Sequence, residues 1–183
     1  MPLLTSEIDI SKARAVGGWM TESELLWLAQ QAQTREVIVE LGSYLGRSTR
    51  ALADHSPGLV YAIDDWFGPR DKPSTLTREN RAFLFDMFKW NVRDLGEDKL
   101  RILRCDHKHI PIEIQPDMVF IDGGHEYGNV CYDIQYWMPR LKSGGLLCGH
   151  DYDPNFPDVI KAVSELVPNY RVASGTAIWY CIQ

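Results

Sequence analysis

Short apolar runs in this 183-residue chain end repeatedly in acids, histidines or glycines, which are residue types that bind ligands or move protons. In an open parallel sheet, ligands bind beyond the carboxyl ends of the strands, where the strand order reverses. Carboxylates and imidazoles placed there can take up a proton, hold a metal ion or accept hydrogen bonds. Four such groups mark the candidate site: Glu40 to Ser48, Asp64 with Asp65, Asp122 to His125, and His150 with Asp151.

The first group is a glycine turn, in which Gly42 and Gly46 stand four residues apart after an apolar run. Glycines there let the backbone approach a ligand closely and let the next helix pack tightly. The nicotinamide fingerprint needs a glycine two positions after the first, and Tyr44 occupies that position. The turn therefore disfavours a diphosphate, and a purely structural tight turn stays an alternative.

Asp64 ends the second apolar run, where a carboxylate can accept two charge-assisted hydrogen bonds from ribose hydroxyls. Together with the glycine turn, it indicates an adenosine site. The alternative for Asp64 and Asp65 is a helix cap or a loop acid.

The elements that must position these groups alternate between short apolar runs and amphipathic stretches, which is typical of an α/β fold. Thr21 to Glu24 form a capping box that starts a helix, and Gly175 with Thr176 predicts an antiparallel hairpin at the end of the chain. The irregular stretch 66–80 is predicted to be an active-site loop. Expected helices cover 22–33, 48–53, 84–95, 130–141 and 157–167, and expected strands cover 37–41, 59–63, 100–103, 118–121, 146–148, 170–173 and 177–182.

Composition narrows the class of protein further. A net charge of −6 without a basic run disfavours binding to nucleic acid. The four cysteines form no CxxC pair, so we expect reduced thiols in a cytoplasmic protein. No apolar run reaches membrane-helix length, and the start of the chain lacks the pattern of a signal peptide. We expect a single domain over 1–183, with an acceptor-side helical segment at 1–35 and a cofactor-binding core at 36–183.

Several motifs, in order, carry a specific resemblance. They are Val39 to Thr49, Tyr61 to Asp64, Phe120 to Tyr127, and Leu141 to Gly145. Over about residues 22 to 183 the chain resembles class I S-adenosylmethionine (SAM)-dependent methyltransferases, above all the small-molecule O-methyltransferases of the catechol and macrocin type. The resemblance implies a Rossmann-like, mostly parallel seven-stranded sheet with the last strand antiparallel and helices on both faces.

The same resemblance implies a SAM site built by the strand ends. Asp64 would hold the ribose, and Asp106, with His107 beside it, would lie by the adenine, although a solvated acid is an equal alternative for Asp106. Asp122 belongs to the cofactor set as well. The methionine end of the cofactor is assigned to the glycine turn: Glu40, Gly42, Ser43, Tyr44, Gly46 and Ser48.

A divalent cation is a second expectation, because the catechol-type enzymes hold magnesium at positions that match Asp122, His150 and Asp151. A histidine in the set shifts the preference from Mg²⁺ toward Mn²⁺, Zn²⁺ or Fe²⁺. Such an ion would lower the pKa of a bound substrate hydroxyl. The alternative is that Asp122 bonds backbone amides or the cofactor's amine and that His150 is a satisfied loop histidine.

His125 is the candidate general base, with Asp122 as the other catalytic residue, because the resemblance places a basic residue there near the acceptor hydroxyl. Its alternative role is to orient the loop after the strand. The remaining histidines, His55, His107 and His109, are expected at the surface.

The acceptor is expected to be a small molecule with no separate domain to bind it. Its apolar walls would be Trp19, Met20, Trp66 and Phe67, which suit a planar or amphipathic compound. For Trp19 and Met20, core packing or a homodimer contact is an equal alternative. The expected reaction is O-methylation, and the competing hypotheses are a non-catalytic cofactor-binding or interaction protein and an NAD-linked oxidoreductase.

Overall fold

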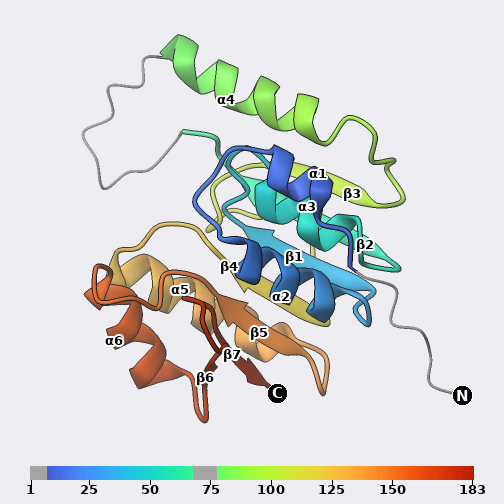
Figure 1. Ribbon diagram of the computed structural model, residues 1–183. Helices are drawn as coiled ribbons and strands as arrows, with labels where there is room; N and C mark the ends of the chain where they lie inside the picture. Colours follow the sequence, from blue (N-terminus) through green and yellow to red (C-terminus); the bar gives the residue numbers. More distant parts are fainter. Residues whose placement is uncertain (1–7, 68–77) are drawn as a thin grey trace, which may run out of the picture.

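The computed structural model describes residues 8–67 and 78–183, and in the fourth helix it describes side chains from Phe83 onward. Its centre is a seven-stranded sheet with the order β3-β2-β1-β4-β5-β7-β6 (Figure 1). All pairings are parallel except those that β7 makes with β5 and β6. The strands are β1 (Val37–Leu41), β2 (Leu59–Asp64), β3 (Leu100–Arg104), β4 (Met118–Ile121), β5 (Leu146–Gly149), β6 (Arg171–Val172) and β7 (Trp179–Ile182).

Helices cover both faces of this sheet (Figure 1). The expected Rossmann-like α/β fold, with seven strands and an antiparallel strand near the end of the chain, is therefore confirmed. One helical layer contains α1, α2, α3 and α4, and the other contains α5 and α6. The helices are α1 (Ser11–Ala15), α2 (Glu22–Ala32), α3 (Arg47–Ala53), α4 (Arg78–Asn91), α5 (Tyr127–Trp137), the 3₁₀ turn η1 (Met138–Arg140) and α6 (Pro157–Leu166).

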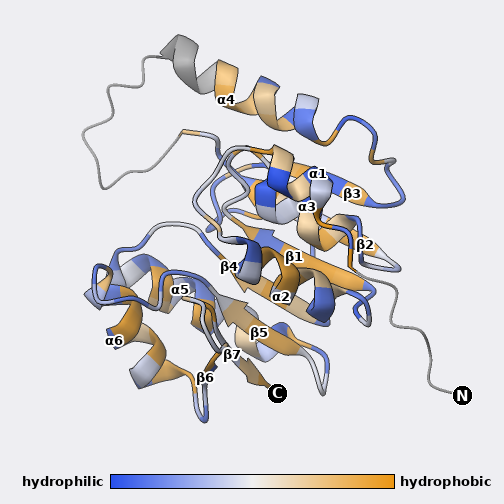
Figure 2. Ribbon diagram, viewed as in Figure 1, coloured by the Kyte–Doolittle hydropathy of each residue, from blue (hydrophilic) through white to orange (hydrophobic). Residues whose placement is uncertain are grey.

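The two faces of the sheet bury alternate residues of the same strands, as the period of two requires. In β1, Ile38 packs with α2 and α3, whereas Val39 and Leu41 pack with α5 and α6. The strands accordingly form the hydrophobic centre of the molecule (Figure 2). Strands whose apolar residues point to both sides predict a sheet that is covered by helices on both faces.

The predicted capping box at the start of α2 is present. Thr21 accepts a hydrogen bond from the backbone of Glu24, and the Glu24 side chain accepts one from the backbone of Thr21. Leu25 and Leu28 then face the core at helical spacing. This local sequence fixes where α2 starts and which of its faces is buried.

Strand β1 is the point where the order of the sheet reverses. Its end lies between the ends of β2 and β4, since Leu41 pairs with Ile63 on one side and with Ile121 on the other. Ligands of doubly wound folds bind at this crevice. The four candidate groups follow β1, β2, β4 and β5 and therefore gather at one edge of the sheet.

Several predicted boundaries were wrong. The short helix α1 was not predicted, and α5 starts at Tyr127 and ends at Trp137, after which Pro139 leaves only a 3₁₀ turn. The helix predicted at 84–95 starts at Arg78 and ends at Asn91. The predicted loop at 66–80 thus overlaps α4, and its residues 68–77 lie outside the described part of the chain.

The terminal hairpin is present but has shorter strands than predicted. β6 has two residues and β7 four, and the connection contains Gly175 with a positive φ of 74°. Within 8–67 and 78–183, no helix is long and apolar enough to cross a membrane.

Candidate active site

The glycine turn after β1 touches the end of β4. Gly42 has a φ of 85°, and a Cβ atom at that position would overlap the backbone oxygen of Asp122. The backbone N–H of Asp122 donates to the carbonyl of Leu41 at 2.8 Å. Glycine is required here because two strand ends meet backbone to backbone. The first and third candidate groups are therefore neighbours.

Asp64 holds this turn from the side of β2. Its Oδ2 accepts hydrogen bonds from the backbone N–H groups of Ser43 and Tyr44, each at 2.9 Å, and its Oδ1 accepts one from Trp66 at 2.6 Å. Burial raises the pKa of Asp64, and these three N–H donors oppose that rise. The predicted ribose acid thus also organises the turn, and its contact with ribose stays a prediction.

Glu40 lies fully buried beneath the turn. Its Oε2 accepts hydrogen bonds from the hydroxyls of Ser43 at 2.7 Å and Thr49 at 2.5 Å. Its Oε1 is buried without a hydrogen-bond partner among the described residues. Burial raises the pKa of Glu40, against the hydrogen bonds from Ser43, Ser48 and Thr49. An unpaired buried carboxylate oxygen is costly, so a donor group on a ligand would suit this atom.

The four apolar residues predicted to form the acceptor's walls divide into two pairs. Met20 and Trp66 are buried in the core, and Trp66 packs against Phe88 with 4.8 Å between ring centroids, so neither forms an open wall. Trp19 is 74% exposed and lies 5.0 Å from the ring of Tyr44, while Phe67 is 48% exposed. Of these four residues, Trp19 and Phe67 are the two whose exposed rings could meet an incoming molecule.

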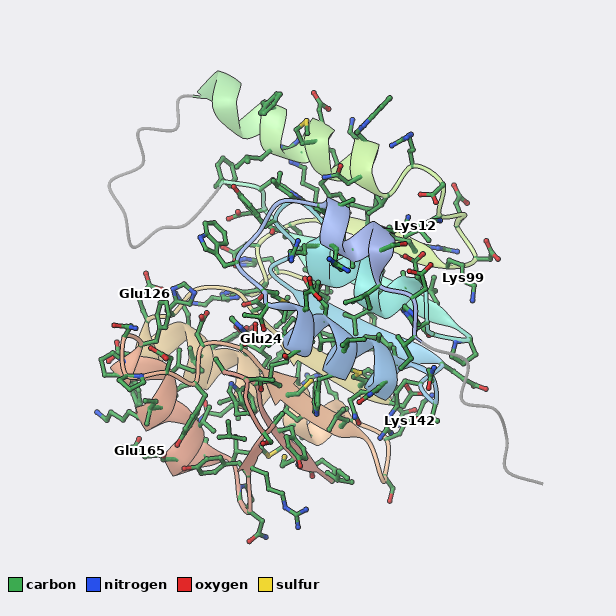
Figure 3. The ribbon with its side chains drawn as sticks, in the orientation of Figure 1. Lys12, Glu24, Lys99, Glu126, Lys142 and Glu165 are labelled. Carbon is green, nitrogen blue, oxygen red and sulfur yellow. The ribbon has the colours of Figure 1, made fainter. Side chains whose placement is uncertain are left out.

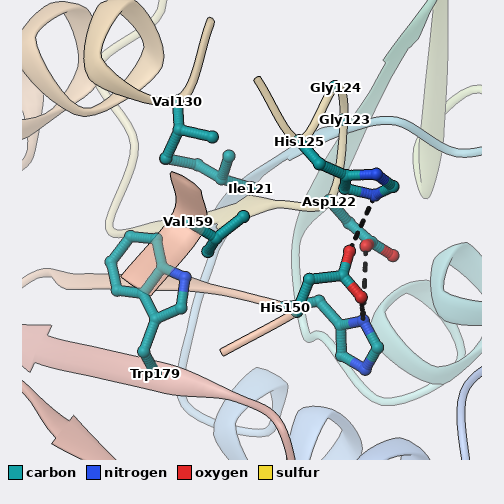
Figure 4. A pocket seen from close by; sticks show the side chains of 10 residues that line it. Ile121, Asp122, Gly123, Gly124, His125, Val130, His150, Val159 and Trp179 are labelled. Atoms are coloured by element: carbon teal, nitrogen blue, oxygen red, sulfur yellow. Dashed lines mark ion pairs between the residues drawn. The ribbon is translucent and has the colours of Figure 1, made fainter. Parts of the chain in front are cut away.

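The ends of β4 and β5 carry a connected set of charged side chains (Figure 4). His125 Nε2 lies 2.8 Å from Asp151 Oδ2. His150 Nδ1 lies 3.1 Å from Asp151 Oδ1 and 3.6 Å from Asp122 Oδ1. On its other side, His150 Nε2 lies 3.1 Å from Glu24 Oε1. The sequence predicted that four of these residues would gather, and the structure brings them together with a fifth, Glu24.

The charges of this set depend on one another. Burial lowers the pKa of His150, but the contacts with Asp151 and Glu24 outweigh burial and raise it to about 11. Burial chiefly raises the pKa of Asp122, to about 7, with Asp151 adding to the rise. The two histidines overcome the burial of Asp151 and hold its pKa well below the usual range. Perturbed groups of this kind concentrate at functional sites.

The predicted metal ligands fit a divalent cation by their chemistry. One ligand atom each from Asp122, His150 and Asp151 can be chosen within 4.8 Å of one another. His150 turns Nδ1 toward the two carboxylates and Nε2 toward Glu24, and a metal-binding histidine typically gives its other nitrogen to a carboxylate in this way. With the proton removed from Nδ1, this set offers two oxygen ligands and one nitrogen ligand.

The loop after β3 differs from the prediction at one residue. Asp106 is half-buried and accepts a hydrogen bond from the backbone N–H of Lys108 at 2.9 Å. His107 is not a surface histidine, because its Nδ1 lies 3.2 Å from the buried Asp133 and its side chain is 18% exposed. His109 is exposed as predicted, and His55 is half-buried with Nδ1 2.9 Å from the carbonyl of Ala51.

Two residues at the site were missed by sequence reasoning. Thr49 was named only as part of the glycine-turn motif and of the following helix, and Glu24 only as a capping residue. A second hydroxyl residue directly after Ser48, in the first turn of α3, is a signal that could have suggested Thr49. No local pattern links Glu24 to His150, since the contact depends on how α2 packs against the end of β5.

Residues 39–152 match the family model described as a methyltransferase domain. The fold is also that of many solved structures, although the search of curated proteins found no match. An O-methyltransferase from Bacillus cereus in complex with SAH is 15% identical, with a TM-score of 0.63 over 95% of this chain and 87% of that one.

Two further structures show how widely this fold is used. The O-methyltransferase TomG from Streptomyces achromogenes, solved with SAM, is 14% identical, with a TM-score of 0.64 over 99% of this chain and 92% of that one. The tRNA (m1A58) methyltransferase TrmI from Aquifex aeolicus is 12% identical, with a TM-score of 0.64 over 91% and 70%. At these identities the likeness establishes the fold alone, and the acceptor must be argued from the site.

Proposed function

The chain belongs to the methyltransferase-domain family, and from that premise we propose that it transfers the methyl group of SAM to a hydroxyl oxygen of a small molecule. The observation that carries the proposal is the contact between His125 Nε2 and Asp151 Oδ2 at 2.8 Å, beside Asp122 at the end of β4. This contact orients the His125 ring by a carboxylate close to the glycine turn, which supports a role for His125 as the base.

The cofactor is assigned to the crevice between β1, β2 and β4. The ammonium group of its methionine end would donate to the unpartnered Oε1 of Glu40. Gly42 keeps the crevice open where the backbone of Asp122 approaches, and Asp64 lies at the end of β2, where ribose hydroxyls bind in this fold. Two bound structures of the fold, the Bacillus cereus enzyme with SAH and TomG with SAM, support this choice of cofactor.

His125 supplies the proton acceptor that a hydroxyl needs. Its contact with Asp151 fixes the neutral ring with the proton on Nε2, so that Nδ1 is the basic atom. The acceptor oxygen attacks the methyl carbon, the bond from carbon to sulfur breaks with its electron pair left on sulfur, and the hydroxyl proton passes to His125. The products are a methyl ether and uncharged S-adenosylhomocysteine. Asp151 stabilises the imidazolium that forms.

Beside this base, Asp122, His150 and Asp151 are the residues that would hold a divalent cation. Such an ion, when bound, lowers the pKa of a substrate hydroxyl. Independently of the ion, Asp151 stays ionised between His125 and His150, and Glu24 holds His150 in place.

A small acceptor is favoured by charge and by the surfaces near the turn. The net charge of −6 opposes a polyanionic substrate such as tRNA. Trp19, packed on Tyr44, and Phe67 offer exposed aromatic surface for a planar or amphipathic molecule. The NAD-linked alternative is disfavoured because Tyr44 stands where a pyrophosphate needs glycine.

The cofactor is tested by thermal unfolding with SAM, S-adenosylhomocysteine and NAD in parallel. A ligand at about 100 times its Kd adds about 2.7 kcal/mol, which raises the Tm of a domain of this size by several degrees. We expect a rise with the two sulfur compounds and none with NAD. A rise with NAD alone contradicts the proposal.

The acceptor is tested with methyl-labelled SAM and matched pairs of small molecules, each pair a phenol or sugar and its analogue with the hydroxyl replaced by hydrogen. We expect label in the hydroxyl compound alone. Label on amines or on tRNA, and not on hydroxyl compounds, would contradict the proposed O-methylation of a small molecule. Repeating the assay with excess chelator and then with added Mg²⁺ or Mn²⁺ tests the ion, since activity that a chelator leaves unchanged removes the metal from the mechanism.

A further inference from the structure

Glu24 performs an ordinary helix-capping role with only one of its two carboxylate oxygens. Oε2 accepts hydrogen bonds from the backbone N–H of Thr21 at 2.8 Å and from its hydroxyl at 2.9 Å. These contacts complete the capping box of α2. A capping box needs no more than this and forms readily at a solvated helix end.

The burial of Glu24 exceeds what a cap requires. Its side chain is 5% exposed, and it lies in the interior at the first turn of α2, whereas Lys99 and Glu165 lie at the periphery (Figure 3). Burying a carboxylate is costly unless it is paired and hydrogen-bonded. The second oxygen must therefore find partners inside the protein.

Those partners belong to the candidate active site. Oε1 accepts a hydrogen bond from the backbone N–H of Ala177 at 3.0 Å and lies 3.1 Å from His150 Nε2. Ala177 precedes β7, and His150 follows β5. One carboxylate thus joins the start of α2, the hairpin connection and the end of β5.

Contacts on both sides of its ring hold His150. Glu24 lies against Nε2, while Asp151 at 3.1 Å and Asp122 at 3.6 Å lie against Nδ1. The contact with Glu24 is an ion pair, because Nε2 makes no hydrogen bond among the described residues. A carboxylate on the Nε2 side nevertheless favours the ring orientation that turns Nδ1 toward the two aspartates. Without Glu24, the ring could rotate or exchange its two nitrogens.

We infer that Glu24 is a positioning residue of the active site, which fixes the orientation of the His150 ring so that Nδ1 faces Asp122 and Asp151. The start of α2 and the active site are then coupled, because Glu24 caps the helix with Oε2 and contacts His150 with Oε1. The kinetic consequence rests on the proposed function, whereas the orientation of His150 does not.

The test compares Glu24→Gln with Thr21→Ala. Glutamine is accepted at this capping position, so Glu24→Gln keeps much of the cap and removes the charge beside His150. Thr21→Ala weakens the cap and leaves the Oε1 contacts in place. The primary readout is the ¹⁵N spectrum of the His150 ring, assigned by comparison with His150→Asn. Isothermal titration with Mn²⁺ and with S-adenosylhomocysteine gives two binding readouts, and kcat and KM give a kinetic one.

We expect Glu24→Gln to move the ring ¹⁵N signals of His150, to weaken Mn²⁺ binding or lower kcat by roughly 10- to 100-fold, and to change S-adenosylhomocysteine affinity less than about twofold. Thr21→Ala should lower the Tm by a few degrees and leave the His150 signals in place.

Unmoved His150 signals in Glu24→Gln, or equal shifts in both variants, would reduce Glu24 to a cap and overturn the inference. If Glu24→Gln does not fold, Glu24→Asp replaces it, because the shorter side chain draws the carboxylate away from His150 Nε2. Unmoved His150 signals in that variant would equally overturn the inference. Failure of the proposed function would be seen in a different measurement. The wild-type protein would then methylate no hydroxyl compound, while Glu24→Gln would still move the His150 signals.

Discussion

The two halves of the candidate site are held by different kinds of interaction. At the ends of β1 and β2, backbone N–H groups and hydroxyls hold the acids Asp64 and Glu40. At the ends of β4 and β5, the contacts run between charged side chains, from His125 through Asp151 and His150 to Glu24. At the ends of β1 and β2, the positions of the acids depend on backbone hydrogen bonds. At the ends of β4 and β5, the positions of the side chains depend on which of the histidines and carboxylates carry a proton.

This difference matches the two tasks of a methyltransferase. A cofactor site must keep one shape for one ligand, and backbone donors are present whatever the pH. Acid–base chemistry needs groups whose protonation can change, and coupled side chains provide them. The two halves meet at Gly42 and Asp122, so one position can disturb both.

Gly42→Ala should have the largest effect. Its φ of 85° disfavours any Cβ, and the added atom would overlap the Asp122 backbone. Strain and overpacking together should cost about 2 to 5 kcal/mol in unfolding free energy and abolish both cofactor binding and turnover. Gly144→Ala is the matched control, with a φ of 75° and open space around it, and should cost about 1 to 2 kcal/mol. If thermal unfolding shows that Gly42→Ala and Gly144→Ala lose the same unfolding free energy, the contact of Gly42 with Asp122 contributes nothing beyond backbone strain.

His125→Ala should come next and separate the halves. Loss of a general base lowers kcat by about 10²- to 10⁴-fold. Cofactor affinity should stay near that of the wild type, because His125 pairs with Asp151 rather than with the turn. Steady-state rates and S-adenosylhomocysteine titration measure both quantities. The exposed His109→Ala serves as control, and full turnover in His125→Ala would contradict the assignment of the base.

Asp64→Asn should damage the other half. Its carboxylate accepts three backbone hydrogen bonds, and losing the charge weakens each of them. We expect S-adenosylhomocysteine to bind about 10- to 100-fold more weakly by calorimetry, from a loss of about 1.5 to 3 kcal/mol. The neighbouring Asp65→Asn should change the affinity only slightly. Equal effects at the two positions would argue against a special role for Asp64.

The smallest expected effect is a slope of stability with pH. His150 has a pKa of about 11 in the folded protein, above its usual value of 6.5, so it binds its proton more tightly when folded. Its contribution is complete below pH 6.5 and is lost as the pH rises toward 11, at no more than about 1.4 kcal/mol per pH unit. In chelator, between pH 7.5 and 10, the Tm should fall more steeply in the wild type than in His150→Asn. Parallel curves would contradict this.

The sequence predicts most of the fold because its signals are local. Thr21 and Glu24 start α2, Gly42 ends β1, and alternate apolar residues assign the strands to a sheet covered on both faces. Helix α1 was not predicted because it has only five residues and no side-chain cap. Short elements of that kind depend on tertiary contacts for their stability.

Of the site, the sequence predicts which strand ends meet but not how their side chains pair. Because the sheet order brings the ends of β4 and β5 together, Asp122 and Asp151 could be grouped in advance. The contact between Glu24 and His150 could not, since it depends on helix packing. Trp66 was likewise misplaced, because an aromatic residue after a strand carries no sign of which way its φ of 53° will turn it.

Arg47, the first residue of α3, fastens the segment before α2 to the glycine turn. Its guanidinium donates to the carbonyls of Arg14 at 3.0 Å, Val16 at 2.6 Å and Met20 at 2.9 Å. Ile10, Ala13 and Met20 also bury their side chains in the core, so the segment is held by apolar packing together with the Arg47 hydrogen bonds. A short segment of this kind should open as a unit, below the free energy of global unfolding. Amide hydrogen exchange should show residues 11–20 exchanging together, and faster still in Arg47→Ala, while the amides of β1 and β4 stay protected.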